Sequence, residues 1–377
     1  MNTSSPQDFE AILSRFDIQG NVREIKPYGS GHINGTFLVK NSVEGAPDYL
    51  LQRVNDYVFK DVPGLMQNAV IVTEHLRKKL EQIPGSNPER EVLTIIPTKN
   101  GEYYYKDEEG NYWRVYLYVG NTKSYDILET EQQASEGGKA FGRFQFLLSD
   151  LDSSRLIETI PNFLNMESRL KNFHKAVKED AAGRVKECQA EITFINERAD
   201  AMCTIVRLGR EGKLPLRITH NDTKFNNVLL DENDKALCVI DLDTVMPGYT
   251  AYDFGDAMRT ITNTAAEDEK DLSKIQVNLP LFEAYTKSYL KEAAGFLTEA
   301  EINSLMEGVL LLPFMQAVRF LTDYLEGDKY YKIHFPGHNL QRTRAQLQLF
   351  KKLEENYSRM NDIIQNEVSA LRASLST

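Results

Sequence analysis

The chain has 377 residues, 41% hydrophobic and 26% charged, which is ordinary for a folded protein large enough to form two domains. Its formal net charge of −11 argues against partners such as nucleic acid or an anionic membrane surface. The three scattered cysteines make neither a disulfide framework nor a zinc site, and the start MNTSSPQDFE lacks the features of a signal peptide, so we expect a cytoplasmic protein.

The beginning of the chain predicts a short amphipathic helix over residues 7–17, followed by two strands joined by a glycine-rich turn. Glycine lets the backbone approach a ligand closely, so the N–H groups of such a turn can surround phosphates. The spacing G-x-G-x-x-x-G is by itself more typical of a plain hairpin, but the segment 218–260 described below favours phosphate binding. The candidate phosphate-binding residues are Gly29, Ser30, Gly31, His32, Asn34, Gly35 and Thr36.

The next strand is expected over residues 49–54, and its cation is Arg53. Alternation along a strand places Leu51 and Arg53 on one face, so Leu51 could line a nucleotide pocket while Arg53 reaches the phosphates. Gln52 is the alternative if the register shifts by one residue. An arginine at a strand end is also commonly a solvated surface residue. The apolar stripe of residues 63–80 predicts a helix, and Glu74 on it is the candidate partner of Arg53.

Turn signals divide the following segment into three further strands, expected over residues 91–97, 102–106 and 112–119. These strands and one helix predict a small β-rich N-terminal lobe formed by residues 1–119. The last strand runs into Gly120-Asn121-Thr122, so we expect a hinge at about residues 119–122, where the backbone of Val119 and Asn121 holds the nucleotide base.

The rest of the chain, residues 120–377, is expected to form a larger and mostly helical lobe. Residues 131–148 carry small side chains at close helical spacing, which suits a tightly packed helix. The other expected helices cover residues 163–180, 187–208, 279–293, 298–324 and 339–357, and a surface helix with a frayed end follows Tyr357. The most apolar segment, 309–320, contains a proline, a glutamine and an arginine, so we expect no membrane span.

The segment 218–260 carries the candidate chemistry. His220-Asn221-Asp222 is followed by Asn227, two short apolar runs separated by a turn, and then Asp241-Leu242-Asp243. The two runs predict a hairpin, which brings Asn227 at its start close to Asp241 at its end. Mg²⁺ takes a few oxygen ligands from protein and the rest from phosphates and water, so an asparagine and one or two carboxylates suit it.

The pattern H-x-D-x-x-x-x-N, hairpin, Asp is that of protein-kinase-like enzymes. The motifs HNDTKFNNVLLD, DLDTVMPG and YDFGD resemble the small-molecule branch, which includes aminoglycoside phosphotransferases and choline kinases. Within that branch they are most similar to the N-acetylhexosamine 1-kinases, a group sometimes labelled mucin desulfatase. The resemblance extends from about Tyr28 to about Leu349. It implies an α+β fold of the protein-kinase-like two-lobe type, with ATP and Mg²⁺ as cofactors.

The resemblance also implies a role for each residue of the segment. Asp222 would accept or orient the proton of the acceptor hydroxyl, with Lys224 as a cation near the transferred phosphate or as a solvated lysine. Asn227 and Asp241 would bind Mg²⁺, and Asp243 could share a second ion. His220 and Asp253 would brace the catalytic loop. Asp256 would cap or charge the start of the helix leading to Arg259.

The implied acceptor site lies near the end of the expected helix 298–324. Arg319 and Tyr330 match the residues that bind the sugar in the hexosamine kinases. The alternative for Arg319 is a buried ion pair with Asp323 or Glu326. Where that group tends to have Phe-His, this chain has Phe163-Leu164, so no sugar contact is carried over to Leu164.

The favoured function is therefore an ATP-dependent kinase of the anomeric hydroxyl of an N-acetylhexosamine, with a small molecule as its partner and an undetermined oligomeric state. The alternative is a kinase of the same fold that acts on choline, an aminoglycoside or another small alcohol. A more distant alternative is a non-catalytic pseudokinase that binds nucleotide, which the presence of Asp222, Asn227 and Asp241 disfavours. A sulfatase is excluded because the chain lacks the Cys/Ser-x-Pro-x-Arg motif.

Overall fold

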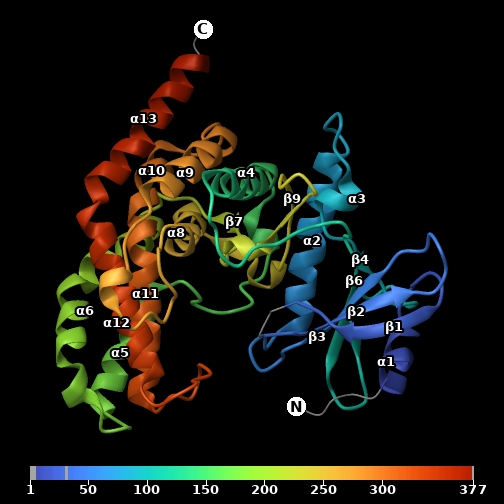
Figure 1. Cartoon of the computed structure of the whole chain (residues 1–377), viewed down its shortest axis with the longest axis horizontal. Helices are drawn as coiled ribbons and strands as arrows, with labels where there is room; N and C mark the ends of the chain where they lie inside the picture. The colour runs from blue at the N-terminus through green and yellow to red at the C-terminus, as the bar shows by residue number, and fades with distance from the viewer. Residues whose placement is uncertain (1–5, 30–32, 376–377) are drawn as a thin grey trace. The chain divides into compact units, whose positions relative to one another are not determined.

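The computed structural model describes residues 6–29 and 33–375, so the predicted turn residues Ser30, Gly31 and His32 lie outside the described part (Figure 1). The chain forms two compact units. The first comprises Met1–Lys123, Ser154–Pro161 and Leu229–Met246, and the second comprises Ser124–Ser153, Asn162–Val228 and Pro247–Thr377. The sequence predicts a single boundary between the lobes, at about residues 119–122. The hairpin after Asn227 instead belongs to the first unit.

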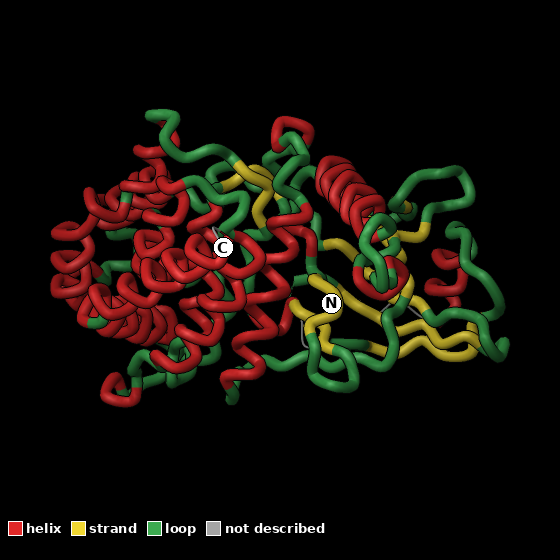
Figure 2. The backbone as a smooth tube through the Cα atoms, turned by 90° about the horizontal axis from the view of Figure 1, so that it is seen from above, coloured by secondary structure: helices red, strands yellow, loops and turns green. Residues whose placement is uncertain are grey.

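The first unit is built on an antiparallel sheet of six strands in the order β1-β2-β3-β6-β4, with β5 paired to β6. Strands are drawn in yellow in Figure 2. The strands are β1 (Val22–Pro27), β2 (Gly35–Asn41), β3 (Tyr49–Val54), β4 (Ile95–Ile96), β5 (Tyr105–Lys106) and β6 (Tyr112–Leu117). The predicted strand 49–54 is therefore confirmed. The region predicted as strand 91–97 starts instead with a short helix, α3 (Pro88–Glu91), because Pro88 favours the first turn of a helix.

The two faces of this sheet differ in character. Leu51 pairs with Val115 and Gln52 pairs with Arg114, so alternation places these pairs on opposite faces. The face with Leu51 packs against α1 (Pro6–Leu13) in one apolar cluster that includes Phe9 and Trp113. The opposite face carries Gln52 and Arg114. Its polar side chains therefore need partners from other segments of the unit.

Those segments are held by α2 (Val62–Leu80), which matches the predicted helix 63–80 and begins with the Asp61 side chain accepting from the Gly64 N–H. Asn68 of α2 donates to the carbonyl oxygens of Ile157 at 2.7 Å and of Val245 at 3.1 Å. It thereby fixes the inserted segments 154–161 and 229–246. The second of these contains the hairpin of β8 (Val228–Leu230) and β9 (Ala236–Val239), apart from the first residue of β8.

The second unit is mostly helical. Its helices are α4 (Glu131–Leu147), α5 (Met166–Glu179), α6 (Gln189–Met202), α7 (Thr204–Arg210), α8 (Thr250–Ile261), α9 (Leu279–Ala293), α10 (Glu299–Asn303), α11 (Leu305–Glu326), α12 (His338–Glu355) and α13 (Tyr357–Leu375). A two-stranded ladder joins β7 (Arg217–Thr219) to β10 (Met246–Gly248). The predicted tail helix is not a plain surface helix, because Met360, Ile364 and Val368 are buried.

The helix α11 lies in the core of this unit, packed against α5, α8 and α12. It is long and apolar enough to cross a membrane by length and composition, whereas the sequence analysis expects no membrane span in this region. However, 72% of its apolar window is buried inside the unit, as in the core helix of a soluble protein.

Glycines allow α4 and α9 to approach closely. A Cβ atom built on Gly138 would lie 2.2 Å from the carbonyl oxygen of Tyr285, and one on Gly142 would lie 2.7 Å from that of Tyr289. The predicted tight packing of residues 131–148 is thus confirmed. This contact fixes α4, which carries several residues that surround the candidate catalytic loop.

Candidate active site

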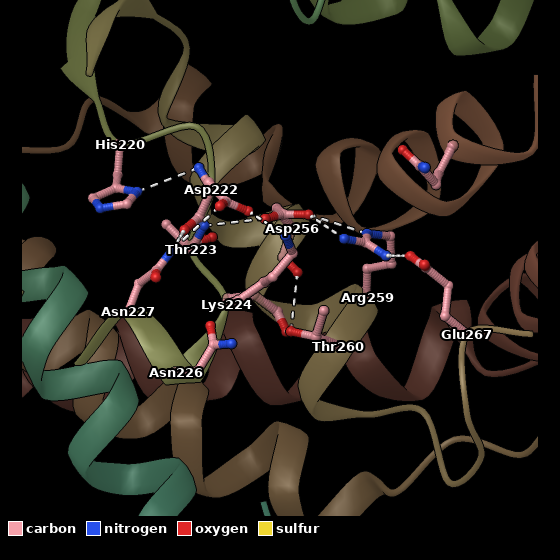
Figure 3. A network of polar contacts seen from close by, with 12 residues as sticks. His220, Asp222, Thr223, Lys224, Asn226, Asn227, Asp256, Arg259, Thr260 and Glu267 are labelled. Carbon is pink, nitrogen blue, oxygen red and sulfur yellow. Dashed lines mark hydrogen bonds and ion pairs between the residues drawn. The ribbon is translucent and has the colours of Figure 1, made fainter. Parts of the chain in front are cut away.

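The loop between β7 and β8 is held by two carboxylates of α8. Asp253 accepts the N–H groups of His220 at 2.9 Å and Asn221 at 2.7 Å. Asp256 accepts the N–H of Thr223 at 3.0 Å (Figure 3). Residues three apart lie on one helix face, so the spacing within YDFGD lets both reach the same loop. Asp256 lies in the middle of α8 and not at its start, which corrects the predicted capping role.

The loop is further fixed by buried packing around His220. Its Nδ1 accepts the N–H of Asp222 at 3.3 Å, and its ring meets Phe141 and Phe144 of α4 edge-on. The side chain is fully buried. These contacts are the bracing kind that the sequence predicted for His220 and Asp253. Gln145 of α4, which the sequence did not single out, donates to Asp253 at 2.8 Å.

The carboxylate of Asp222 sits between two donors. Its Oδ1 lies 2.9 Å from Nζ of Lys224, and its Oδ2 accepts from Nδ2 of Asn227 at 3.2 Å. Burial favours the neutral acid, but the Lys224 ammonium outweighs this and holds the pKa of Asp222 below its usual range. Burial by itself lowers the pKa of Lys224, but the Asp222 carboxylate raises it by more. The pKa of Lys224 therefore lies above its usual value. Both groups are therefore charged near neutral pH.

The orientation of Asn227 follows from the same contacts. Its Nδ2 also donates to the backbone oxygen of Asp222 at 2.8 Å. Because the amino group is used within the loop, the amide oxygen points away from Asp222. An amide oxygen in this position is a suitable ligand for a hard cation.

Two predicted site residues, Asn121 and Asp241, and the loop residue Asn221 have left-handed backbone conformations. The φ angles are 53° at Asn121, 63° at Asn221 and 60° at Asp241. Such conformations are unfavourable for residues other than glycine and concentrate at functional sites. Asp241 directly precedes the turn Leu242–Thr244 and follows the hairpin strand β9 by one residue.

Asp243 is engaged by donors from the sheet of the first unit. Its Oδ1 lies 2.5 Å from Nη1 of Arg114, and its Oδ2 accepts from Nδ2 of Asn34 at 2.6 Å. Burial opposes the charge of Arg114, but the nearby Asp243 carboxylate raises its pKa above the ordinary value. Both oxygens of Asp243 thus face N–H donors. This arrangement favours a structural ion pair over the predicted share in a second metal ion.

The same sheet separates Arg53 from the polar network around Arg114. Arg53 is exposed and lies with Leu51 on the face that α1 covers, and no ion pair joins it to Glu74 within the described residues. On the other face, Gln52 accepts from Nε of Arg114 at 3.0 Å and donates to Oγ1 of Thr36 at 2.9 Å. Arg114 is the buried arginine that the sequence reading missed.

The remaining predicted residues of the first unit lie at two turns. Gly29 has a φ angle of 81°, whereas Gly35 begins β2 opposite Arg53. At the expected hinge, Arg90 of α3 donates to the carbonyl oxygens of Gly120 at 3.0 Å and Asn121 at 3.3 Å. The carbonyl oxygen of Val119 accepts from Thr122 at 3.1 Å. Side chains therefore fix the carbonyl groups of this segment.

Arg319 does not form either of the ion pairs considered for it. Asp323 instead accepts the N–H groups of Lys329, Tyr330 and Tyr331, and Glu326 forms no ion pair in the described residues. Arg319 donates to Gln316 at 3.1 Å, and its guanidinium lies 5.6 Å from the centre of the Tyr331 ring. Tyr330, the predicted sugar contact, is 60% exposed and meets Tyr331 edge-on.

The donor set offers hard oxygen ligands. Within residues 6–29 and 33–375, no group of three or more His, Cys, Asp or Glu side chains forms a metal site. This excludes a site of the zinc type there, but it is compatible with Mg²⁺, which needs one or two carboxylates and otherwise uses phosphates and water. The amide oxygen of Asn227 and the carboxylate of Asp241 have the right chemistry for that role.

Comparisons with known proteins identify the family and the fold. A model of the phosphotransferase enzyme family (APH) matches residues 24–285. The structure of an amicoumacin kinase with AMP-PNP, Ca²⁺ and Ami is similar, with a TM-score of 0.63, 11% identity, and coverage of 93% of this chain and 94% of that one. A microcompartment-associated aminopropanol kinase has a TM-score of 0.61, 16% identity, and coverage of 95% and 99%. The ethanolamine kinase of Plasmodium vivax has a TM-score of 0.54, 13% identity, and coverage of 86% and 82%. These three structures support the kinase-like fold.

Proposed function

This chain belongs to the phosphotransferase enzyme family, and we propose that it is an ATP- and Mg²⁺-dependent kinase whose acceptor is the anomeric hydroxyl of an N-acetylhexosamine. The observation that supports phosphoryl transfer most directly is the charged Asp222 on a loop held by Asp253 and Asp256. In such enzymes, positioning and charge stabilisation supply most of the rate acceleration.

In the proposed reaction, Asp222 orients the acceptor hydroxyl and accepts its proton as the hydroxyl oxygen bonds to the γ-phosphorus of ATP. The bond from that phosphorus to the β,γ-bridging oxygen breaks at the same time, and ADP leaves with this oxygen. The lowered pKa of Asp222 makes it a weak base, which suits an anomeric hydroxyl because this group is more acidic than an ordinary alcohol. Lys224 stabilises negative charge beside it. Asn227 and Asp241 would hold Mg²⁺, whose contribution when bound is to neutralise charge on the phosphates.

For the nucleotide, we propose that the turn residues Gly29, Asn34 and Gly35 lie over the phosphates. Thr36 and Gln52 lie on the polar face of the sheet with Arg114, so we assign the phosphate-facing role to this face.

The backbone of Val119 and Asn121 would hold the base. Arg53 keeps no part in this proposal because it is exposed on the opposite face.

The proposed acceptor site contains Arg319 and Tyr330. An arginine without a carboxylate partner in the described residues suits the hydroxyl and carbonyl oxygens of a sugar. The names of the similar structures favour a second candidate, a kinase of amino alcohols or aminoglycosides. A cationic acceptor would be repelled by Arg319, so we place this candidate second.

We also propose a cytoplasmic location.

The test measures ADP release with ATP and Mg²⁺ on N-acetylglucosamine, N-acetylgalactosamine, glucose, galactose, choline and kanamycin. We expect turnover on the N-acetyl sugars, with phosphate on the anomeric carbon. Asp222→Asn should lower kcat by about 100-fold or more while ATP still binds. The matched control is Asp200→Asn, because Asp200 is a surface carboxylate whose side chain is 93% exposed.

Turnover on choline or kanamycin alone would overturn the sugar assignment and support the second candidate. ATP binding without turnover on any acceptor, and unaltered by Asp222→Asn, would instead support a pseudokinase.

A further inference from the structure

A second arginine, Arg169, shares the neighbour Phe163 with Arg319. Arg169 of α5 donates through Nε and Nη2 to the carbonyl oxygen of Phe163, at 3.2 Å and 2.5 Å. The guanidinium of Arg319 lies 5.7 Å from the centre of the Phe163 ring and 5.6 Å from that of Tyr331. We call Phe163, Arg169, Arg319, Tyr330 and Tyr331 the arginine–aromatic cluster.

The positive charge of this cluster has no carboxylate partner among the described residues. The nearby Asp323 is saturated by the N–H groups of Lys329, Tyr330 and Tyr331 and by Asn339. Burial and the like charge of Arg319 lower the pKa of Arg169 to about 10. Two adjacent cations without an anion are unfavourable, so the arrangement is better satisfied when a negative group binds.

The donors that such a group needs are available and held in place. Nε and Nη2 of Arg169 donate to Phe163, and Nη1 of Arg319 donates to Gln316. These bonds hold both guanidinium groups in place. The other N–H groups of the two side chains make no hydrogen bond within the described residues. Planar guanidinium groups bind carboxylate and phosphate oxygens in pairs. The adjacent Tyr330 is 60% exposed, so the cluster is open to solvent on that side.

We infer that Arg169 and Arg319 together bind an anionic substituent, a carboxylate, phosphate or sulfate, and that the preferred acceptor carries this group. The second half of this inference rests on the proposed function, because that function places Arg319 in the acceptor site. It narrows the preferred acceptor from N-acetylhexosamines in general to their negatively charged derivatives, and it makes Arg169 a specificity-determining residue.

The test is calorimetric titration of the whole protein with N-acetylglucosamine, N-acetylglucosamine 6-phosphate and inorganic phosphate. We expect the phosphorylated sugar to bind at least about tenfold more tightly than the neutral sugar, because its hydrogen bonds are charge-assisted. The preference should weaken at high salt. It should disappear in Arg169→Gln and Arg319→Gln, and Arg169→Lys should keep only part of it.

Arg198→Gln is the matched control, since Arg198 pairs with Glu354 at the surface and should leave the preference unchanged. Arg319→Gln serves as the second variant if loss of the bonds to Phe163 prevents Arg169→Gln from folding. Equal binding of the neutral and phosphorylated sugars by the unaltered protein would overturn the inference.

The separate titration with inorganic phosphate distinguishes failure of the site from failure of the proposed function. If neither sugar binds but phosphate binds and depends on Arg169 and Arg319, the anion site stands and the sugar assignment falls. If phosphate does not bind either, the anion site is overturned as well.

Discussion

Arg114 of β6 and Asp243 form an ion pair of 2.5 Å in which the two side chains are only 2% and 3% exposed. Asn34 and Gln52 complete its hydrogen bonding, so the sheet and the segment after β9 are joined by one polar network. Buried pairs of this kind cost desolvation energy, but removing one partner leaves the other charge uncompensated.

We therefore predict that Arg114→Met lowers the free energy of unfolding by about 3–5 kcal/mol. Asp243→Asn should have a similar effect, and the double variant should lose much less than the sum of the two, as measured by urea unfolding. Arg198→Gln, at a surface pair, should cost no more than about 1 kcal/mol. Additive losses in the double variant would argue against direct coupling.

A second prediction concerns the two faces of the same sheet. Arg53→Gln should change the KM for ATP by less than about twofold, because exposed residues outside special contacts rarely matter. Gln52→Leu removes the partner of Arg114 and Thr36 and should raise the KM for ATP. Steady-state kinetics with varied ATP provide the measurement. A large increase in the KM for ATP in Arg53→Gln would instead support the sequence prediction that Arg53 contacts the phosphates.

The two faces of the sheet show which features could be predicted from the sequence and which could not. Alternation correctly paired Leu51 with Arg53, but it carries no information on which face meets the ligand. That choice depends on α1, whose Phe9 packs on the Leu51 face from far away in the chain. The signal for Arg114 was present, because an arginine between apolar residues of a strand needs a buried partner.

Sequence patterns predicted the structure well where the relevant contacts are between residues close together in the chain. The helix predicted over 279–293 has these same bounds in α9, which begins with Asn278 as its cap. Asp256 was a partial exception, because it lies in the middle of α8 on the same face as Asp253 and not at the predicted helix start. In contrast, Arg169 lies on α5 and Arg319 lies on α11. No pattern within one segment predicts that these two charges interact.

The ion pair between Lys224 and Asp222 predicts a specific pH dependence. The pKa of Asp222 lies below its usual range, so the ionised form, and with it kcat/KM, should persist to low pH and fall as the carboxylate takes up a proton. Lys224→Met removes the stabilising cation, which raises the pKa of Asp222. The acidic limb of the profile should then move to higher pH.

The matched control for this profile is Lys287→Met, since Lys287 pairs with Glu283 on the surface of α9. It should leave the acidic limb unchanged. An acidic limb that stays in place in Lys224→Met would show that Asp222 is not the group that controls it.

The contact between α4 and α9 leads to a prediction with an unusual sign. Replacing a helical glycine by alanine normally stabilises a protein, because it reduces the freedom of the unfolded chain. At Gly138 the new Cβ would lie 2.2 Å from the backbone oxygen of Tyr285, which cannot move without shifting α9. We predict that Gly138→Ala lowers the free energy of unfolding by about 1–3 kcal/mol.

The same shift should affect the candidate site, because α4 carries Gln145, which donates to Asp253 and accepts from the Tyr289 hydroxyl at 2.6 Å. A displaced α4 would weaken this support of the loop that holds Asp222, so kcat should fall even at temperatures where the variant is folded. Thermal unfolding and kinetics of Gly138→Ala are compared with Gly295→Ala, where a Cβ would meet nothing within 4 Å. Stabilisation by Gly138→Ala would mean that the two helices separate readily and do not fix the loop.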